Sequence, residues 1–402
     1  MMDVKTNGLG KKVVSLALLG ATTSLMAMYG EHAYLYKDPR IMGMGGANVA
    51  VGGYSTSVFS NPAGLASIKK EHGMVVDLLG IGVSASVDNA QNLIDDIDAA
   101  GDDAGEMVDV LTKYSGENFH LGVDNYTAIS RNGDAFAWSI GFLSAVDANF
   151  VTYGNGSSTG GLLDTTTRIY GGVVVGVAKP YETEIGHLDV GFSVKYISQI
   201  SYEGSLTVAD LVDDNNDLEQ QFRDKYEKES TGIGLDIGVA YHPFKESGWD
   251  PVFGLSVLNI GSMSMDDAYG GQPLTVNVGV SVTPELSFLN ELVFAVDYMD
   301  LFNANKIRLY DYSTNENEVQ YTDYEESDFM KRLRVGVGVG LFDTWLISTK
   351  LNAGLYQGAY TAGLDFQLAI LKLNVATYQE QLGTGGVDIP DRRYMAKLAI
   401  GW

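Results

Sequence analysis

The chain of 402 residues has no cysteine, only 8 prolines and half as many basic as acidic residues. Without cysteine it has no disulfides, no thiolate metal sites and no cysteine nucleophile. Its 26 lysines and arginines face 51 aspartates and glutamates, and the net charge of -25 argues against binding to nucleic acid because phosphates would be repelled. After the N-terminus no apolar run reaches about 18 residues, which excludes a bundle of membrane-spanning helices.

The N-terminus has the pattern of an export signal. Two lysines precede the apolar stretch Val13–Ala21, and a mixed run of mostly small residues follows up to Ala27. We therefore predict a signal peptide at residues 1–27, with cleavage between about Ser24 and Gly30. The alternative is an uncleaved membrane anchor, although the apolar stretch is short for spanning a bilayer. Either interpretation takes the chain out of the cytoplasm.

From residue 71 onward apolar residues recur at every second position, which places them on one face of extended strands. In Leu188–Tyr196 the other face carries Asp189, Gly191, Ser193 and Lys195. A soluble sandwich would turn charged residues outward and large ones inward, whereas small residues and single charges suit a lumen. We predict an all-β fold, a closed transmembrane antiparallel β-barrel at residues 71–402 whose apolar face meets outer-membrane lipids.

About 14 strands are expected, centred near residues 76, 124, 141, 173, 194, 237, 256, 278, 295, 336, 350, 363, 375 and 397. Barrels of this kind have long loops outside the cell and short turns in the periplasm. The long connections are at about 86–116, 147–165, 203–230, 262–272 and 301–330. An even number of strands returns both termini to the periplasm.

Two of these outer loops have helical periodicity and predict helical insertions at about 88–113 and 206–228. Their opposite faces are strongly acidic. They are interpreted as solvated caps over the barrel mouth; alternatively they receive substrate, or divalent cations bridge them to lipopolysaccharide phosphates. We assign no metal and no cofactor.

Aromatic side chains near strand ends suggest girdles at the two membrane interfaces. The candidates are Tyr181, Tyr202, Tyr241, Trp249, Tyr298, Trp345, Tyr356 and Tyr378. The last strand places Tyr394, Ala396, Leu398, Ile400 and Trp402 on one face. Tyr394, Leu398, Ile400 and Trp402 resemble the terminal signal that barrel-assembly machinery recognises, although Phe is usual at the last position.

Residues 38–66 contain glycines, notably Gly45 and Gly46, followed by Asn61, Pro62 and Ala63. The glycines permit positive φ and close backbone approach, and Asn-Pro fits a helix N-cap followed by proline. This segment resembles the N-terminal segment of the FadL/TodX-like outer-membrane barrels, and most closely their conjugal-transfer TraF-like branch. The resemblance implies that residues 28–70 form a hatch that plugs the barrel. It also implies uptake of long-chain fatty acids or other hydrophobic compounds across the outer membrane of a Gram-negative bacterium.

The sequence contains no catalytic signature, and we expect a protein that is not an enzyme. A lipid-modifying barrel with serine and histidine assembled across strands is the enzymatic alternative.

The charged lumen candidates are expected to pair with one another or with the hatch; they are Asp189, Lys195, Asp236, Asp297, Arg334, Lys350, Asp365 and Lys397. Besides a channel, a non-conducting platform for assembly or anchoring of conjugation or secretion machinery remains open. An apolar tunnel would favour the channel, and a lumen filled by paired charges the platform.

Overall fold

The computed structural model describes residues 34–86, 90–101, 103–152, 161–184, 186–207, 220, 223–224, 226–244, 247–265, 268–310, 321–344, 346–383 and 389–402. The expected signal peptide, residues 1–27, lies outside the described residues. So do the start of the expected hatch, most of the expected insertion at 206–228, and Trp345.

Fourteen antiparallel strands close into one barrel, as the alternation predicted. Strands that are neighbours in the wall are also consecutive barrel strands along the chain. The one exception is β1 and β16, which pair with each other to close the ring. The strands are β1 Met74–Ser86, β2 Asn118–Asn132, β3 Ala137–Thr152, β4 Gly161–Thr183, β5 Gly186–Thr207, β6 Glu227–His242, β7 Pro251–Gly261, β8 Thr275–Val282, β9 Glu291–Tyr298, β12 Leu333–Asp343, β13 Ile347–Tyr356, β14 Ala359–Leu368, β15 Leu371–Gln381 and β16 Pro390–Gly401.

The outer face of the barrel is apolar, whereas the inner face carries many polar and charged residues, with apolar side chains where the hatch packs. Along β5 the exposed Phe192, Val194 and Tyr196 alternate with the buried Ser193 and Lys195. A wall of this kind faces lipid with its apolar side chains and pairs all strand edges internally. In the described residues no helix is long and apolar enough to cross a membrane.

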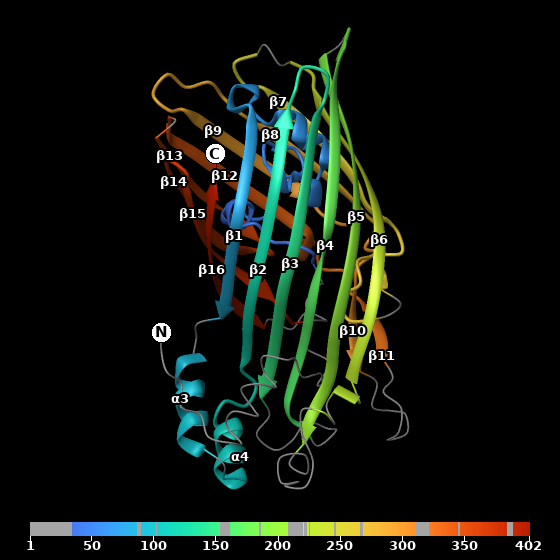
Figure 1. Cartoon of the computed structure of the whole chain (residues 1–402), viewed down its shortest axis with the longest axis vertical. Helices are drawn as coiled ribbons and strands as arrows, with labels where there is room; N and C mark the ends of the chain where they lie inside the picture. The colour runs from blue at the N-terminus through green and yellow to red at the C-terminus, as the bar shows by residue number, and fades with distance from the viewer. Residues whose placement is uncertain are drawn as a thin grey trace.

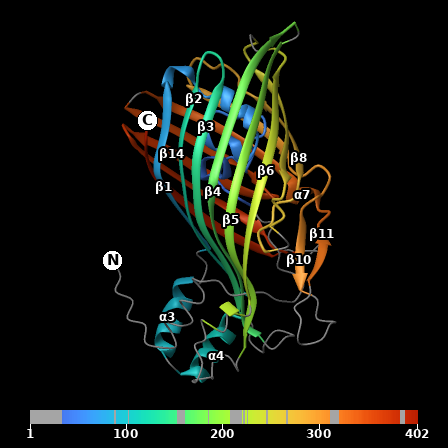
Figure 2. The same ribbon diagram turned by 45° about the vertical axis from the view of Figure 1, so that its right-hand side comes forward.

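Long connections gather at one end of the barrel and short turns at the other (Figure 1). At the long-connection end lie helices α3 Ala90–Ala100 and α4 Ala104–Lys113, and the hairpin of β10 Lys306–Tyr310 with β11 Tyr321–Glu325 (Figure 2). A short helix, α7 Phe329–Arg332, leads into β12. The β10–β11 hairpin and α7 lie in a connection that the sequence pattern left without secondary structure.

Helices α3 and α4 build a second apolar core beyond the barrel mouth. Leu93, Ile97, Met107 and Leu111 on the helices pack with Tyr202 near the end of β5. The strands β4 and β5 have 23 and 22 residues, and their ends run past the barrel to meet the helices. This helical insertion is therefore docked on the wall strands.

Two groups of residues differ from expectation. Tyr202, Tyr356 and Tyr378 were expected in aromatic girdles but are 1%, 6% and 0% exposed. Tyr202 belongs to the second apolar core, with α3 and α4. Tyr356 and Tyr378 point into the lumen, where their rings contact each other. The connection between β7 and β8 was expected outside the barrel, yet Met263 and Met265 are fully buried against the hatch core.

Inside the barrel lie a short helix and 3-10 turns that connect to β1. They are α2 Pro39–Gly43, η1 Ser55–Phe59, η2 Pro62–Ser67 and η3 Lys70–His72. Between them they contact strands on opposite sides of the wall: α2 packs on β13 to β16, and η2 on β2 to β6. We call residues 28–70 the hatch; its described part, from residue 34, lies inside the barrel toward the short-turn end (Figure 1).

Candidate functional site

The hatch docks on the wall where Asn61 caps η2. The Asn61 side-chain oxygen accepts from the Ala63 N–H at 3.1 Å, and Pro62 follows as the first residue of the turn. Its amide nitrogen donates to the carbonyl of Val49 within the hatch at 2.7 Å and to that of Val239 on β6 at 3.0 Å. One buried side chain thus caps a turn, ties two parts of the hatch together and holds both to the barrel.

Glycines of the wall make this approach possible. A Cβ at Gly238 on β6 would overlap the Asn61 side chain, and one at Gly191 on β5 would overlap the Pro62 and Ala63 backbone. The hatch therefore lies against wall backbone that carries no side chain. Any larger residue at these two wall positions would push the hatch away.

A second docking point lies at the end of α2. Gly45 and Gly46 have φ of +68° and +80°, and a Cβ on Gly45 would overlap carbonyls of the wall. The hydroxyl of Thr361 on β14 accepts from the Gly45 N–H at 3.0 Å and donates to the Gly43 carbonyl at 2.8 Å. On the wall, Gly336 has no room for a Cβ because the Met44 carbonyl lies there.

Buried carboxylates complete the attachment. Asp297 on β9 accepts the backbone N–H groups of Asn48 and Val49 at 2.6 and 2.7 Å. Within the hatch, Asp38 forms an ion pair with Arg40 at 2.6 Å and accepts from the Thr56 hydroxyl at 2.7 Å. Burial alone would raise the pKa of the Asp38 carboxyl, but the Arg40 guanidinium holds that pKa well below its ordinary value.

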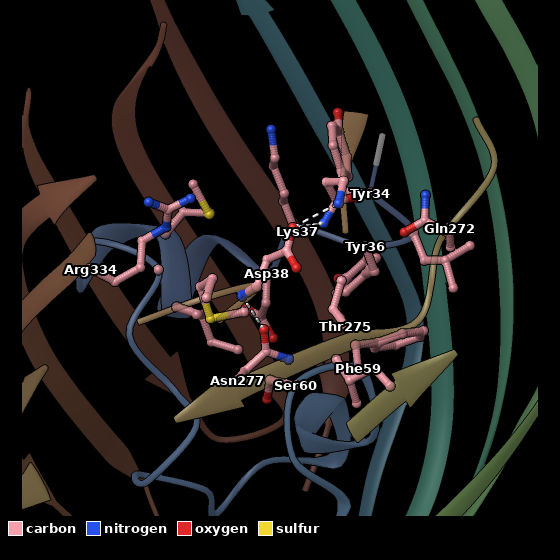
Figure 3. A pocket seen from close by; sticks show the side chains of 18 of the residues that line it. Tyr34, Tyr36, Lys37, Asp38, Phe59, Ser60, Gln272, Thr275, Asn277 and Arg334 are labelled. Atoms are coloured by element: carbon pink, nitrogen blue, oxygen red, sulfur yellow. Dashed lines mark hydrogen bonds between the residues drawn. The ribbon is translucent and has the colours of Figure 1, made fainter. Parts of the chain in front are cut away.

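Between the hatch and the wall lies a cavity of about 230 Å³ (Figure 3). Hatch residues form one side, and the long-connection ends of β7, β8, β12 and β13 form the other. Its apolar lining includes Leu35, Ile41, Met42, Phe59, Leu258 and Met299. Its cationic lining consists of Lys37, Lys195, Lys331, Arg332 and Arg334.

Arg334 differs from the lysines of this lining. Lys37, Lys195 and Lys331 each pair with a carboxylate, at 2.7, 2.9 and 3.1 Å. Arg334 is 8% exposed, and its Nη1 donates to the carbonyls of Lys331 and Leu333. Its guanidinium lies 4.0 Å from the centre of the Tyr356 ring. No carboxylate in the described part of the chain forms a direct ion pair with it, although Asp297 lies opposite it on β9 and Asp38 and Asp300 also line the cavity.

The other lumen charges divide into several groups. Lys195 and Asp236 pair with each other at 2.9 Å, as expected. Asp297 and Lys397 bind the hatch; the Lys397 ammonium donates to the Tyr36 hydroxyl at 2.6 Å. Two further pairs of the expected residues lie opposite each other on neighbouring strands, Lys350 with Asp365 and Arg334 with Asp297. Their direct contacts are with other wall groups: Asp189 contacts His187 and His242, Lys350 contacts Glu291, Asp365 contacts Asn352 and Asn374, and Arg334 contacts carbonyls.

The hatch residues singled out in the sequence thus lie at two separate wall contacts. Gly45 and Gly46 meet β12 to β14, whereas Asn61, Pro62 and Ala63 meet β5 and β6. Sequence reasoning missed the wall glycines on the other side of each contact and the cavity between the contacts. Glycine at lumen-facing positions such as Gly191 and Gly238 was the available signal, because only a close neighbour explains a bare position inside a strand.

The last strand is placed as its pattern predicted. Tyr394, Leu398 and Trp402 are exposed on the outer face of β16, and Ile400 lies on the same face. The backbone groups of Trp402 exchange hydrogen bonds with those of Val76, so the final residue closes the barrel against β1. Its role as an assembly signal remains a prediction.

Comparison with known proteins adds the family. The sequence model of the family described as "F plasmid transfer operon, TraF, protein" matches residues 58–272, more than half of the chain. No curated protein matches the chain.

Among solved structures, the toluene transporter TbuX of Ralstonia pickettii is similar at 13% identity and a TM-score of 0.51, covering 94% of this chain and 99% of that one. A mutant of the monoaromatic hydrocarbon channel TodX gives 11% identity and a TM-score of 0.52, covering 94% and 98%. A FadL homologue of Pseudomonas aeruginosa gives 10% identity and a TM-score of 0.46, covering 93% and 98%. At such identities the first two show a shared fold. The chain therefore belongs to the TraF family of the F plasmid transfer operon and has the fold of the FadL-like outer-membrane barrels.

Proposed function

We propose that this barrel binds an amphiphile with an apolar body and an anionic head group, and passes it inward across the outer membrane of a Gram-negative bacterium. Long-chain fatty acids are one such class. The observation that carries the proposal is the cavity beside the hatch, which combines an apolar lining with the buried guanidinium of Arg334.

The size and chemistry of the cavity support a small ligand. An apolar cavity of about 150 Å³ is enough to hold benzene, and this one measures about 230 Å³. Asp297, opposite Arg334 on β9, already accepts two N–H groups of the hatch, whereas a ligand carboxylate can take two parallel hydrogen bonds from the guanidinium. The lining thus favours an anionic amphiphile over the neutral aromatic compounds named for TbuX and TodX.

The hatch is the element whose movement would open a route. The described strands close the wall, so we place the route through the lumen. Apart from its continuation into β1, the hatch is tied to that wall by hydrogen bonds and close packing, and no disulfide holds it because the chain has no cysteine. Displacing it would connect the cavity with the short-turn end of the barrel.

Binding of dodecanoate to the purified protein in detergent tests the proposal, with dodecanol as the neutral control. Arg334→Met should weaken dodecanoate binding at least tenfold and change dodecanol binding less than twofold. Ser130→Ala, a lumen substitution away from the cavity lining, should leave both unchanged. Equal losses for both ligands, or no binding of either by the wild type, would contradict an anion subsite at Arg334.

A second function, an assembly or anchoring platform, has its own support. Most lumen charges are paired within the barrel, and the α3–α4 insertion has an apolar core of its own beyond the mouth. Such an insertion could present a surface to other components without any flux. If the barrel is such a platform and conducts no amphiphile, deletion of residues 88–113 should abolish conjugation or secretion while leaving the barrel folded.

A further inference from the structure

Three neighbouring strands place a serine, a histidine and an asparagine together on the lumen face. Ser84 is on β1, His120 on β2 and Asn149 on β3. His120 is directly opposite Asn149, and Ser84 is opposite Gly122, two residues from His120 on the same face. The absence of a side chain at Gly122 leaves room for the hydroxyl of Ser84, which a Cβ there would overlap.

The hydrogen bonds fix the roles of the histidine nitrogens. The Asn149 Oδ1 atom lies 3.2 Å from Arg393 Nη2 and accepts its hydrogen bond. The same oxygen lies 2.9 Å from His120 Nδ1, so Nδ1 must carry the proton. When His120 is neutral, its unprotonated Nε2 faces the Ser84 hydroxyl, 2.9 Å away. The serine donates to a base, which is the arrangement of an activated nucleophile.

A buried carboxylate lies behind the histidine. Asp147 on β3 has one oxygen 3.6 Å from His120 Nδ1, and its other oxygen accepts from Arg168 at 2.9 Å. This negative charge would stabilise the imidazolium that forms when His120 takes a proton. Serine, histidine and an orienting acceptor are thus assembled across strands, in the manner of the enzymatic alternative raised by the sequence.

The site adjoins a small cavity of about 20 Å³, lined by Ser84, Gly122 and Asp147 and covered by the hatch. Tyr34, Tyr36 and Lys37 line both this cavity and the larger one beside Arg334. The segment Tyr34–Lys37 is therefore the partition between the two. A space of this size holds a water molecule but no acyl chain, so a substrate reaches Ser84 only when the partition shifts.

We propose that Ser84 is a nucleophile for carboxylic esters of amphiphiles, with His120 as general base. Ser84 Oγ attacks the ester carbonyl carbon and its proton passes to His120 Nε2. The bond from the carbonyl carbon to the alkoxy oxygen breaks, and the alcohol leaves with that proton, which forms an acyl-Ser84. Water then attacks the acyl carbon and gives a proton to His120, which returns it to Ser84 Oγ as the carboxylic acid is released. Asn149 is a positioning residue that fixes the tautomer.

Treatment of the detergent-purified full chain with a fluorophosphonate and with p-nitrophenyl butyrate tests this. Mass spectrometry should find one adduct, on Ser84, and Ser84→Ala should abolish it. His120→Gln should slow ester hydrolysis by about 100-fold, the usual lower range for a general base. Asn149→Leu should slow it about tenfold, and Asn149→Asp should restore it because a carboxylate also accepts from Nδ1.

Two controls keep the result interpretable. Ser130→Ala removes another buried lumen hydroxyl of β2, whose partner is Ser139, and should leave labelling unchanged. Tyr34→Ala thins the partition and should speed the labelling of Ser84. Folding of each variant is checked by its gel-mobility shift on boiling. Absence of a Ser84 adduct in both the wild type and Tyr34→Ala, or an adduct rate unchanged in His120→Gln, would overturn the proposal. Dodecanoate binding through Arg334 is measured separately, so failure here leaves that result intact.

Discussion

Contact between the hatch and the wall depends on single glycines, and Gly238 is the most direct case. Gly238→Ala would place a methyl group against the Asn61 side chain and displace the capped turn. A lost cap costs about 1 kcal/mol, which is roughly a fivefold rise in the displaced population. We expect a matching increase in small-ion conductance in planar bilayers with an intact barrel, and a similar increase for Asn61→Ala with Pro62→Ala.

Gly171→Ala is the matched control, because the nearest atom to its added Cβ is the Leu143 carbonyl oxygen at 3.1 Å, in the wall itself. If Gly238→Ala and Gly171→Ala had the same conductance as the wild type, the hatch would not be held by this contact.

Acid should loosen the hatch at Asp38. Because Arg40 lowers the pKa of Asp38 in the docked hatch, this carboxylate stabilises docking above its ordinary pKa of about 4. That contribution is lost as the pH falls through the lower pKa of the docked state. Conductance of the wild type should therefore increase as the pH is lowered from about 4. Asp38→Asn should already have raised conductance at pH 7 and show no further increase in acid. If wild type and variant had the same dependence of conductance on pH, Asp38 would not be the group that stabilises docking.

Among the elements, the last strand carries a separable prediction. Trp402 closes the barrel against β1 and is exposed to the membrane side. Deletion of Trp402 or Trp402→Asp should reduce the amount of inserted barrel, whereas Trp402→Phe should be tolerated because its ring also suits the headgroup region. Immunoblots of membrane and periplasmic fractions measure this. Equal insertion of all three variants would show that the terminal aromatic residue carries no assembly information.

The strands could be predicted from the sequence because a period of two is local and is repeated along the barrel. The wrong girdle residues show where position near a strand end is insufficient. Tyr378 has the same parity as Asn374 and Glu380, both of which face the lumen, and parity would have placed it correctly. Met263 and Met265 are in a connection without periodicity, so their inward fold depends on tertiary packing that no local pattern encodes.

The candidate site was less predictable than the wall. Asn61 and Gly45 were recognised by turn chemistry, which is local. The cavity depends on how β7, β8, β12 and β13 meet the hatch, and Ser84 and His120 are 36 residues apart in sequence. Their proximity follows from strand register, which alternation does not determine.

At the scale of the whole molecule, the two ends of the barrel should face different compartments. We expect the long-connection end to lie outside the cell. The chain has no cysteine, so exposed alanines can be labelled singly: Ala99→Cys on α3 and Ala135→Cys in the turn after β2. A membrane-impermeant maleimide should label only Ala99→Cys on intact cells, and Ala135→Cys only after the outer membrane is permeabilised. The reverse pattern would invert the topology.

Locking the hatch tests the central claim most directly. A Cβ at Gly176 on β4 would lie 2.6 Å from Val58 Cγ1 in the hatch, so the two Cβ positions are within about 4.5 Å, the range of a disulfide. In proteoliposomes, Val58→Cys with Gly176→Cys should block dodecanoate flux when oxidised and restore it when reduced, while each single variant conducts under both conditions. Equal flux with the hatch locked and unlocked would contradict a gating hatch, and absence of flux through the wild type would contradict a channel.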